Sequence, residues 1–108
     1  MQDTIRLTVA QAIVRWLMNQ FIEIDGVETR ICGGGFGIFG HGNVPCLGEA
    51  LYPVHAEMPL YRGQNEQSMG FAAAAYAKAE LRRRFMFCTA SAGPGTANLL
   101  TSAALAHA

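Results

Sequence analysis

Apolar residues recur every three or four positions from Val9 to Trp16, which is the spacing of one face of an amphipathic helix. Thr8 and Gln11 form a Thr-x-x-Gln capping box, in which two side chains satisfy backbone N–H groups at the start of a helix. The pattern predicts a helix over residues 7–21. Its apolar face, Trp16 included, is expected to pack on the core.

After this helix the apolar positions follow strand patterns. Residues 21–30 alternate around the turn dipeptide Asp25-Gly26, which favours a small hairpin or an irregular excursion reaching to about residue 35. Later apolar runs are short and nearly continuous, as is typical of strands buried on both faces. The predicted strands are residues 36–39, 58–61 and 85–89.

Helical patterns lie between and after these strands. The predicted helices are residues 45–51 with Asn43 as the cap, residues 66–81, and residue 96 onward. Small residues from Gly70 to Ala77 form a stripe that suits close core packing or a helix pair across a dimer interface. The alternation predicts the α/β class, with a parallel sheet covered by helices. Three strands are few for such a sheet, so residues 1–108 are expected to be part of one incomplete domain.

The composition of the chain mainly argues against several classes of function. The formal net charge is zero over 108 residues and 51% of them are hydrophobic, which allows one small domain and gives no electrostatic case for nucleic acid or a membrane surface. We recognise no signal peptide and no spanning segment. Cys32, Cys46 and Cys88 are odd in number and widely spaced, which indicates buried thiols in a reducing cytoplasm rather than a disulfide framework or a zinc site.

Candidate chemistry stands at two predicted strand ends. Glu66 lies where an extended segment becomes a helix, at the edge where open α/β sheets bind ligands. A carboxylate there also suits the positive end of the helix dipole, and His41 among glycines suits a simple turn. Gly35, Gly37 and Gly40 match G-x-G-x-x-G, but no strand precedes the first glycine, so the motif supports nucleotide binding only weakly.

Two longer motifs are more specific. Residues 63–79 read GQNEQSMGFAAAAYAKA and residues 91–98 read SAGPGTAN. In this order and separation they resemble the amino-terminal pyrimidine-binding domain of thiamine diphosphate-dependent enzymes, and the resemblance covers nearly the whole chain from Thr8 onward. Ala92 departs from the Ser-Gly-Pro-Gly pattern of that family.

Three further stretches resemble one branch of the family, the trihydroxycyclohexanedione hydrolases of inositol catabolism. They are residues 19–30, residues 38–44 with the turn GHGN, and residues 61–67. Most of the wider family passes directly from the first helix to a strand and has Gly-x-Pro-Gly at the turn. The resemblance implies hydrolysis of the ring C–C bond of 3D-(3,5/4)-trihydroxycyclohexane-1,2-dione to 5-deoxy-glucuronate.

The resemblance also implies residue roles. Glu66 would be catalytic, because it would hydrogen-bond the N1′ nitrogen of the aminopyrimidine and so help to activate the cofactor. His41 and Asn43 would face the substrate, and Ser91 would shape the cofactor loop. Gln67 would support Glu66 without contacting the cofactor. The cofactor-binding residues would be Glu66, Gly93, Pro94, Gly95 and Asn98.

The implied cofactors are thiamine diphosphate and Mg²⁺, and the implied small-molecule partner is the cyclic dione. The family holds the diphosphate and the metal on a separate domain, usually of a second subunit in a dimer or larger assembly, so we expect no metal residues here and no activity from this chain alone. Three alternatives stay open: another thiamine diphosphate enzyme, such as an acetohydroxyacid synthase or a 2-oxoacid decarboxylase, a nucleotide-binding α/β module, and an interaction domain.

Overall fold

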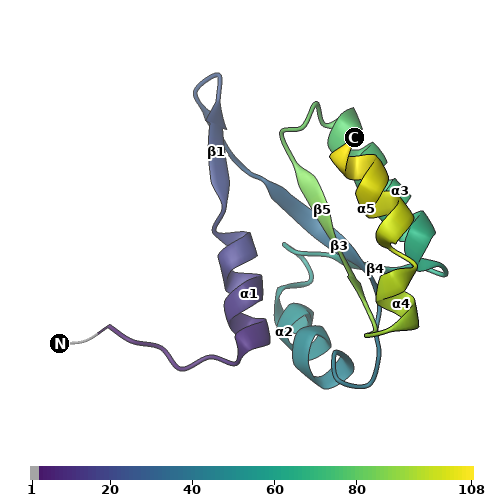
Figure 1. The fold of residues 1–108 in the computed structure, drawn as a ribbon. Coiled ribbons are helices and arrows are strands. Elements are labelled where there is room, and N and C mark those ends of the chain that lie inside the picture. The colour runs from purple at the N-terminus through teal and green to yellow at the C-terminus, as the bar shows by residue number, and fades with distance from the viewer. Residues whose placement is uncertain (1–2) are drawn as a thin grey trace.

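The computed structural model describes residues 3–108 of the chain (Figure 1). Its centre is a parallel sheet with the strand order β4-β3-β5, and helices cover both faces. The strands are β3 (Cys32–Ile38), β4 (Leu60–Arg62) and β5 (Phe85–Ala90). The predicted α/β class and parallel sheet are confirmed.

One face of the sheet is covered by α1 (Val9–Met18) and a helical segment that follows β3. The predicted capping box is present, because the Thr8 hydroxyl accepts from the Gln11 N–H at 3.1 Å and the Gln11 side chain accepts from the Thr8 N–H at 2.9 Å. The core on this face is formed by Val14, Cys32, Leu51 and Met58, with Phe85 and Phe87 of β5 packed against it.

The prediction that Trp16 packs on the core is wrong. Its side chain is 63% exposed, and Val9 and Ile13 on the same stripe are exposed as well. The helix is apolar on two faces, and the face that contains Val14 and Leu17 is the one that turns inward. The spacing predicted the helix but could not say which apolar face meets the sheet.

The segment after β3 also differs from its prediction as one regular helix capped by Asn43. It consists of a π-helical turn at Val44–Gly48, α2 (Glu49–Leu51) and a 3₁₀ turn at Tyr52–Val54. Asn43 makes no capping hydrogen bond, because its backbone is helical at φ −84° and ψ −20°, whereas a cap is extended. Its carbonyl instead accepts from the Gly48 N–H at 2.8 Å, five residues on.

The opposite face of the sheet is covered by α3 (Glu66–Ala79) and α5 (Leu100–His107), which lie side by side (Figure 1). Gly70 contacts the Ser102 side chain, so the small-residue stripe is used within the chain to bring two helices together. The helix predicted from residue 96 onward is two helices, α4 (Pro94–Ala97) and α5, with a break at residues 98–99.

Strand β3 begins four residues before its predicted start, so the glycines belong to the sheet and not to a loop. Gly34 has a φ of +129°, at an irregularity in the register with β5 between Cys32 and Gly35. The Phe87 ring lies against Gly35, where any side chain would overlap it. These glycines therefore allow close packing around the central strand. Their match to the spacing of a nucleotide-binding motif follows from this packing.

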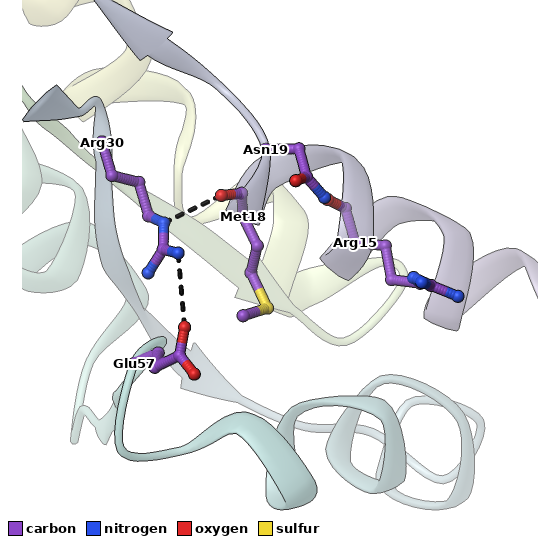
Figure 2. Close-up of polar contacts among 5 residues, drawn as sticks. All are labelled: Arg15, Met18, Asn19, Arg30 and Glu57. Atoms are coloured by element: carbon purple, nitrogen blue, oxygen red, sulfur yellow. Dashed lines mark hydrogen bonds and ion pairs between the residues drawn. The ribbon is translucent and has the colours of Figure 1, made fainter. Parts of the chain in front are cut away.

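The predicted hairpin is confirmed as β1 (Phe21–Ile24) and β2 (Val27–Arg30), and it ends before the predicted limit near residue 35. Asp25 and Gly26 both have positive φ, 52° and 78°, as a two-residue hairpin turn requires. Arg30 anchors the hairpin (Figure 2). Its Nε donates to the Met18 carbonyl at 2.8 Å, and its Nη2 lies 3.3 Å from the Glu57 carboxylate.

Candidate active site

The carboxyl ends of the three parallel strands bring the candidate residues together. Glu66 begins α3 a few residues after β4 ends at Arg62, and residues 91–98 follow the end of β5. Asn65 fixes the start of α3, because its backbone is extended and its side-chain oxygen accepts from the Ser68 N–H at 3.1 Å. The Glu66 carboxylate is thus held in the first turn, where the helix dipole favours a negative charge.

The two oxygens of Glu66 have different surroundings. The Asn98 side-chain amide donates to Oε2 at 3.1 Å. Oε1 lies beside the backbone of Gly95, since a Cβ built on Gly95 would stand 3.2 Å from Oε1 and 2.6 Å from the Ser91 hydroxyl oxygen. Glu66, Ser91, Gly95 and Asn98 therefore form one cluster, which we call the carboxylate cluster.

The loop that carries half of this cluster has a backbone that needs glycine. Gly93 has φ +78° and ψ −120°, a combination that residues with a Cβ rarely adopt. Pro94 then begins α4 with its fixed φ and no N–H left unpaired. Both the Thr96 N–H and the Thr96 hydroxyl donate to the Ser91 carbonyl, at 3.0 and 2.8 Å, which closes the loop over Gly95. Gly93 and Pro94 act on the cluster through the path of the backbone.

His41 and Asn43 lie in a hollow that adjoins the carboxylate cluster. The hollow is lined by the turn at residues 39–43 together with Ser91 and Ala92. Gly40 brings the two walls together, because a Cβ on it would stand 2.7 Å from the Ser91 Cβ. His41 is exposed and Asn43 is half-buried. Ser91 thus belongs to both the hollow and the cluster.

Sequence reasoning missed two features of the site. The capping role of Asn65 was readable from its place before the helix, since asparagine is a preferred cap. The contact between Asn98 and Glu66 joins residues 32 positions apart and had no local signal. Gln67, predicted to support Glu66, is half-buried in the first turn of α3, and no hydrogen bond joins its side chain to the carboxylate cluster within residues 3–108.

Other parts of the described chain offer less chemistry. An apolar groove of about 350 Å³ between α3, β5 and α5 is lined mainly by alanine and other apolar side chains. Over residues 3–108 no three His, Cys, Asp or Glu side chains are placed to hold a metal ion. None of the described helices is both long and apolar enough to cross a membrane.

The three thiols differ in their surroundings. Cys32 is fully buried, and burial raises its pKa, although a hydrogen bond to the Gly34 backbone and the charges of Arg84 and Arg30 oppose that rise. Burial also raises the pKa of Cys88. Cys46 is exposed, so the prediction of buried thiols is wrong for this residue. The two thiols on the sheet are therefore poor nucleophiles, because the thiolate is the reactive form.

Comparisons with known proteins point to one family. Residues 7–108 match the family model described as thiamine pyrophosphate enzyme, N-terminal TPP binding domain. The chain is 51% identical over 106 residues to 3D-(3,5/4)-trihydroxycyclohexane-1,2-dione hydrolase 2 of Bacillus cereus, which is 98% of this chain and 16% of that protein. Hydrolases of the same name from Bacillus thuringiensis (strain Al Hakam) and Bacillus anthracis are 50% identical over the same shares.

The chain thus spans only 16% of the length of these curated relatives. No solved structure matches it. The family model covers every residue of the carboxylate cluster and of the adjoining hollow. The chain belongs to the thiamine pyrophosphate enzyme family and forms part of its amino-terminal TPP-binding domain.

Proposed function

We propose that the protein containing this chain is a thiamine diphosphate-dependent hydrolase that opens the ring of 3D-(3,5/4)-trihydroxycyclohexane-1,2-dione, giving 5-deoxy-glucuronate in inositol catabolism. Support for the substrate comes from the names of relatives that are about 50% identical along nearly the whole chain. Support for the role of the chain comes from one observation, the Glu66 carboxylate with one oxygen tied to Asn98 and the other beside Gly95.

The residues present fit the pyrimidine end of the cofactor. Gly95 is buried, and its missing side chain leaves room for Glu66 Oε1 and the Ser91 hydroxyl, because a Cβ there would crowd both. A ring nitrogen needs a group that can share a proton with it, and the half-buried Glu66 carboxylate is such a group. Glu66 would hold the ring nitrogen, Asn98 donates to the other oxygen of that carboxylate, and the loop from Gly93 to Gly95 would shape the site around the ring.

Thiamine diphosphate, when bound, supplies the carbanion chemistry that cleaves a C–C bond beside a carbonyl. This chain contributes binding, orientation and proton supply. Glu66 would hold a proton at the N1′ nitrogen of the bound cofactor, while its Oε2 accepts a hydrogen bond from Asn98. His41 and Asn43 contact the substrate from the adjoining hollow, where the His41 imidazole can carry a proton to or from a substrate oxygen.

The rest of the proposal concerns what lies outside these residues. We place the diphosphate and its Mg²⁺ on another domain, contributed by a second subunit of a dimer or larger assembly. The chain spans only 16% of the length of its relatives, which leaves room for such a domain. The complete enzyme would then be cytoplasmic and active, and this chain by itself inactive. The nearest alternative is a different thiamine diphosphate enzyme, such as an acetohydroxyacid synthase or a 2-oxoacid decarboxylase.

The test uses the full-length protein with and without thiamine diphosphate, and follows loss of the cyclic dione with pyruvate assayed in parallel. Glu66→Gln should lower kcat by roughly 10²- to 10⁴-fold, the usual contribution of a proton-transferring side chain. Glu28→Gln, at an exposed position in the hairpin, is the matched control and should keep full activity. Turnover of pyruvate alone would reject the substrate, and unchanged turnover by Glu66→Gln would reject the role of Glu66.

A further inference from the structure

The side chain that donates a hydrogen bond to Glu66 comes from a different part of the fold. Asn98 ends α4, and its backbone N–H donates to the Pro94 carbonyl at 3.1 Å, so its position is fixed by a helical turn. Glu66 begins α3, on the other side of β5 in the sequence. The hydrogen bond between them is therefore set by the packing of two elements on the sheet edge.

The chemistry of the contact is one-directional. A carboxylate can only accept, so the Asn98 amide must present its NH₂ group to Oε2, and this donor occupies one of the two oxygens. A glutamate side chain has three rotatable bonds, and a charge-assisted hydrogen bond is strong enough to select among its rotamers. With Oε2 held by Asn98, Oε1 lies against the backbone of Gly95 and is the oxygen that Asn98 does not occupy.

We propose that Asn98 is a positioning residue that holds Glu66 in the one rotamer that presents Oε1 to the pyrimidine N1′ nitrogen, an inference that rests on the proposed function. Asn98 acts through Glu66 and does not itself react. A residue that served only to end α4 would support the loop, and its loss would weaken every cofactor contact alike. A positioning residue supports one contact selectively.

The test compares two ligands that differ at one atom, thiamine diphosphate and its 1′-deaza analogue, which has a C–H in place of N1′. Dissociation constants are measured by calorimetry on the full-length protein with Mg²⁺. The wild type should bind thiamine diphosphate about tenfold more tightly than the analogue, the usual worth of one hydrogen bond. In Asn98→Ala the ratio of the two constants should fall to within about twofold of one, and kcat should fall roughly ten- to a hundredfold.

Asn98→Asp is the second variant, because it keeps the size of the side chain and replaces the donor with an acceptor. It should lose the preference for thiamine diphosphate over the analogue as completely as Asn98→Ala does. The test therefore remains possible if Asn98→Ala folds poorly. Asn19→Ala is the matched control, since the Asn19 amide donates only to the Arg15 carbonyl, at 2.7 Å, at the end of α1. Its ratio should equal that of the wild type.

Two results would overturn the inference in distinguishable ways. If Glu66→Gln abolishes the preference while both Asn98 variants retain it, Asn98 does not position Glu66, although the proposed function stands. If the wild type shows no preference, or binds neither ligand, both the positioning role and the proposed use of Glu66 fall together. Loss of the preference in Glu66→Gln and in both Asn98 variants supports the inference.

Discussion

Gly95 offers a way to disturb the carboxylate cluster without disturbing the fold. It is buried in α4, and its φ lies outside the left-handed region, so alanine can adopt the same backbone. Alanine in place of helical glycine usually raises stability by about 0.5–1 kcal/mol. The added Cβ, however, would stand 2.6 Å from the Ser91 hydroxyl oxygen and 3.2 Å from Glu66 Oε1.

These distances set the expected size of the effect. The Ser91 hydroxyl is the end of a small side chain and can rotate away, whereas Glu66 Oε1 must yield by a few tenths of an ångström. A displacement of about 1 Å can cost a hundredfold in rate, so a shift of this size should lower kcat roughly three- to tenfold. Displacing Glu66 Oε1 should also weaken cofactor binding, because this carboxylate is proposed to hold the ring nitrogen.

The assay is a comparison of Gly95→Ala with Gly93→Ala in the full-length protein, by thermal unfolding without cofactor and by steady-state kinetics with it. Gly95→Ala should keep or slightly raise Tm while kcat falls. Gly93→Ala should lower stability by about 1–3 kcal/mol, because its φ of +78° strains a residue with a Cβ although no atom lies within 4 Å of the added group. A Gly95→Ala enzyme with unchanged kcat and cofactor affinity would refute the crowding argument.

Two further predictions concern the sheet and its helices. Gly70→Ala should lower the free energy of unfolding, measured with denaturant, by about 1–2 kcal/mol, because the new methyl group would overlap the Ser102 side chain. Combining Gly70→Ala with Ser102→Gly should restore most of the lost stability. A double variant as unstable as Gly70→Ala would contradict the contact. In native protein Cys46 should react first with a maleimide, Cys88 more slowly, and Cys32 only on unfolding. Burial raises the pKa of Cys88 and Cys32, so these two thiols stay protonated to higher pH than an exposed thiol. Rapid labelling of Cys32 in folded protein would contradict its burial.

The sequence predicted those elements whose signals are local. Asp25-Gly26 specified a turn by its backbone preference, and the Thr8 and Gln11 side chains specified the start of α1 because a capping box needs only four residues. The features that it did not predict depend on partners distant in sequence. Trp16 lies on one of two apolar stripes, and only the position of the sheet decides which stripe is buried.

The candidate site divides in the same way. The edge of the sheet and Glu66 could be located, since strand ends in a parallel sheet converge and the two longer motifs carry the family resemblance. The glycines from Gly33 to Gly35 were predicted to lie outside the strand, because glycine is rare within strands. They occur in β3 because Phe87 and other neighbours pack closely against its backbone. The link between Asn98 and Glu66 needed coordinates, since it depends on how two helices meet the sheet.

The hairpin β1–β2 forms its own two-stranded sheet and connects to β3 at the end of the parallel sheet opposite the carboxylate cluster. Arg30 closes the hairpin two residues before β3 starts at Cys32, so the length of a seven-residue strand, roughly 20 Å, separates the hairpin from the turn at residues 40–43. The sheet therefore places the hairpin and the carboxylate cluster at opposite ends of the same strand. A longer or shorter turn at Asp25-Gly26 would leave the residues that surround Glu66 in place.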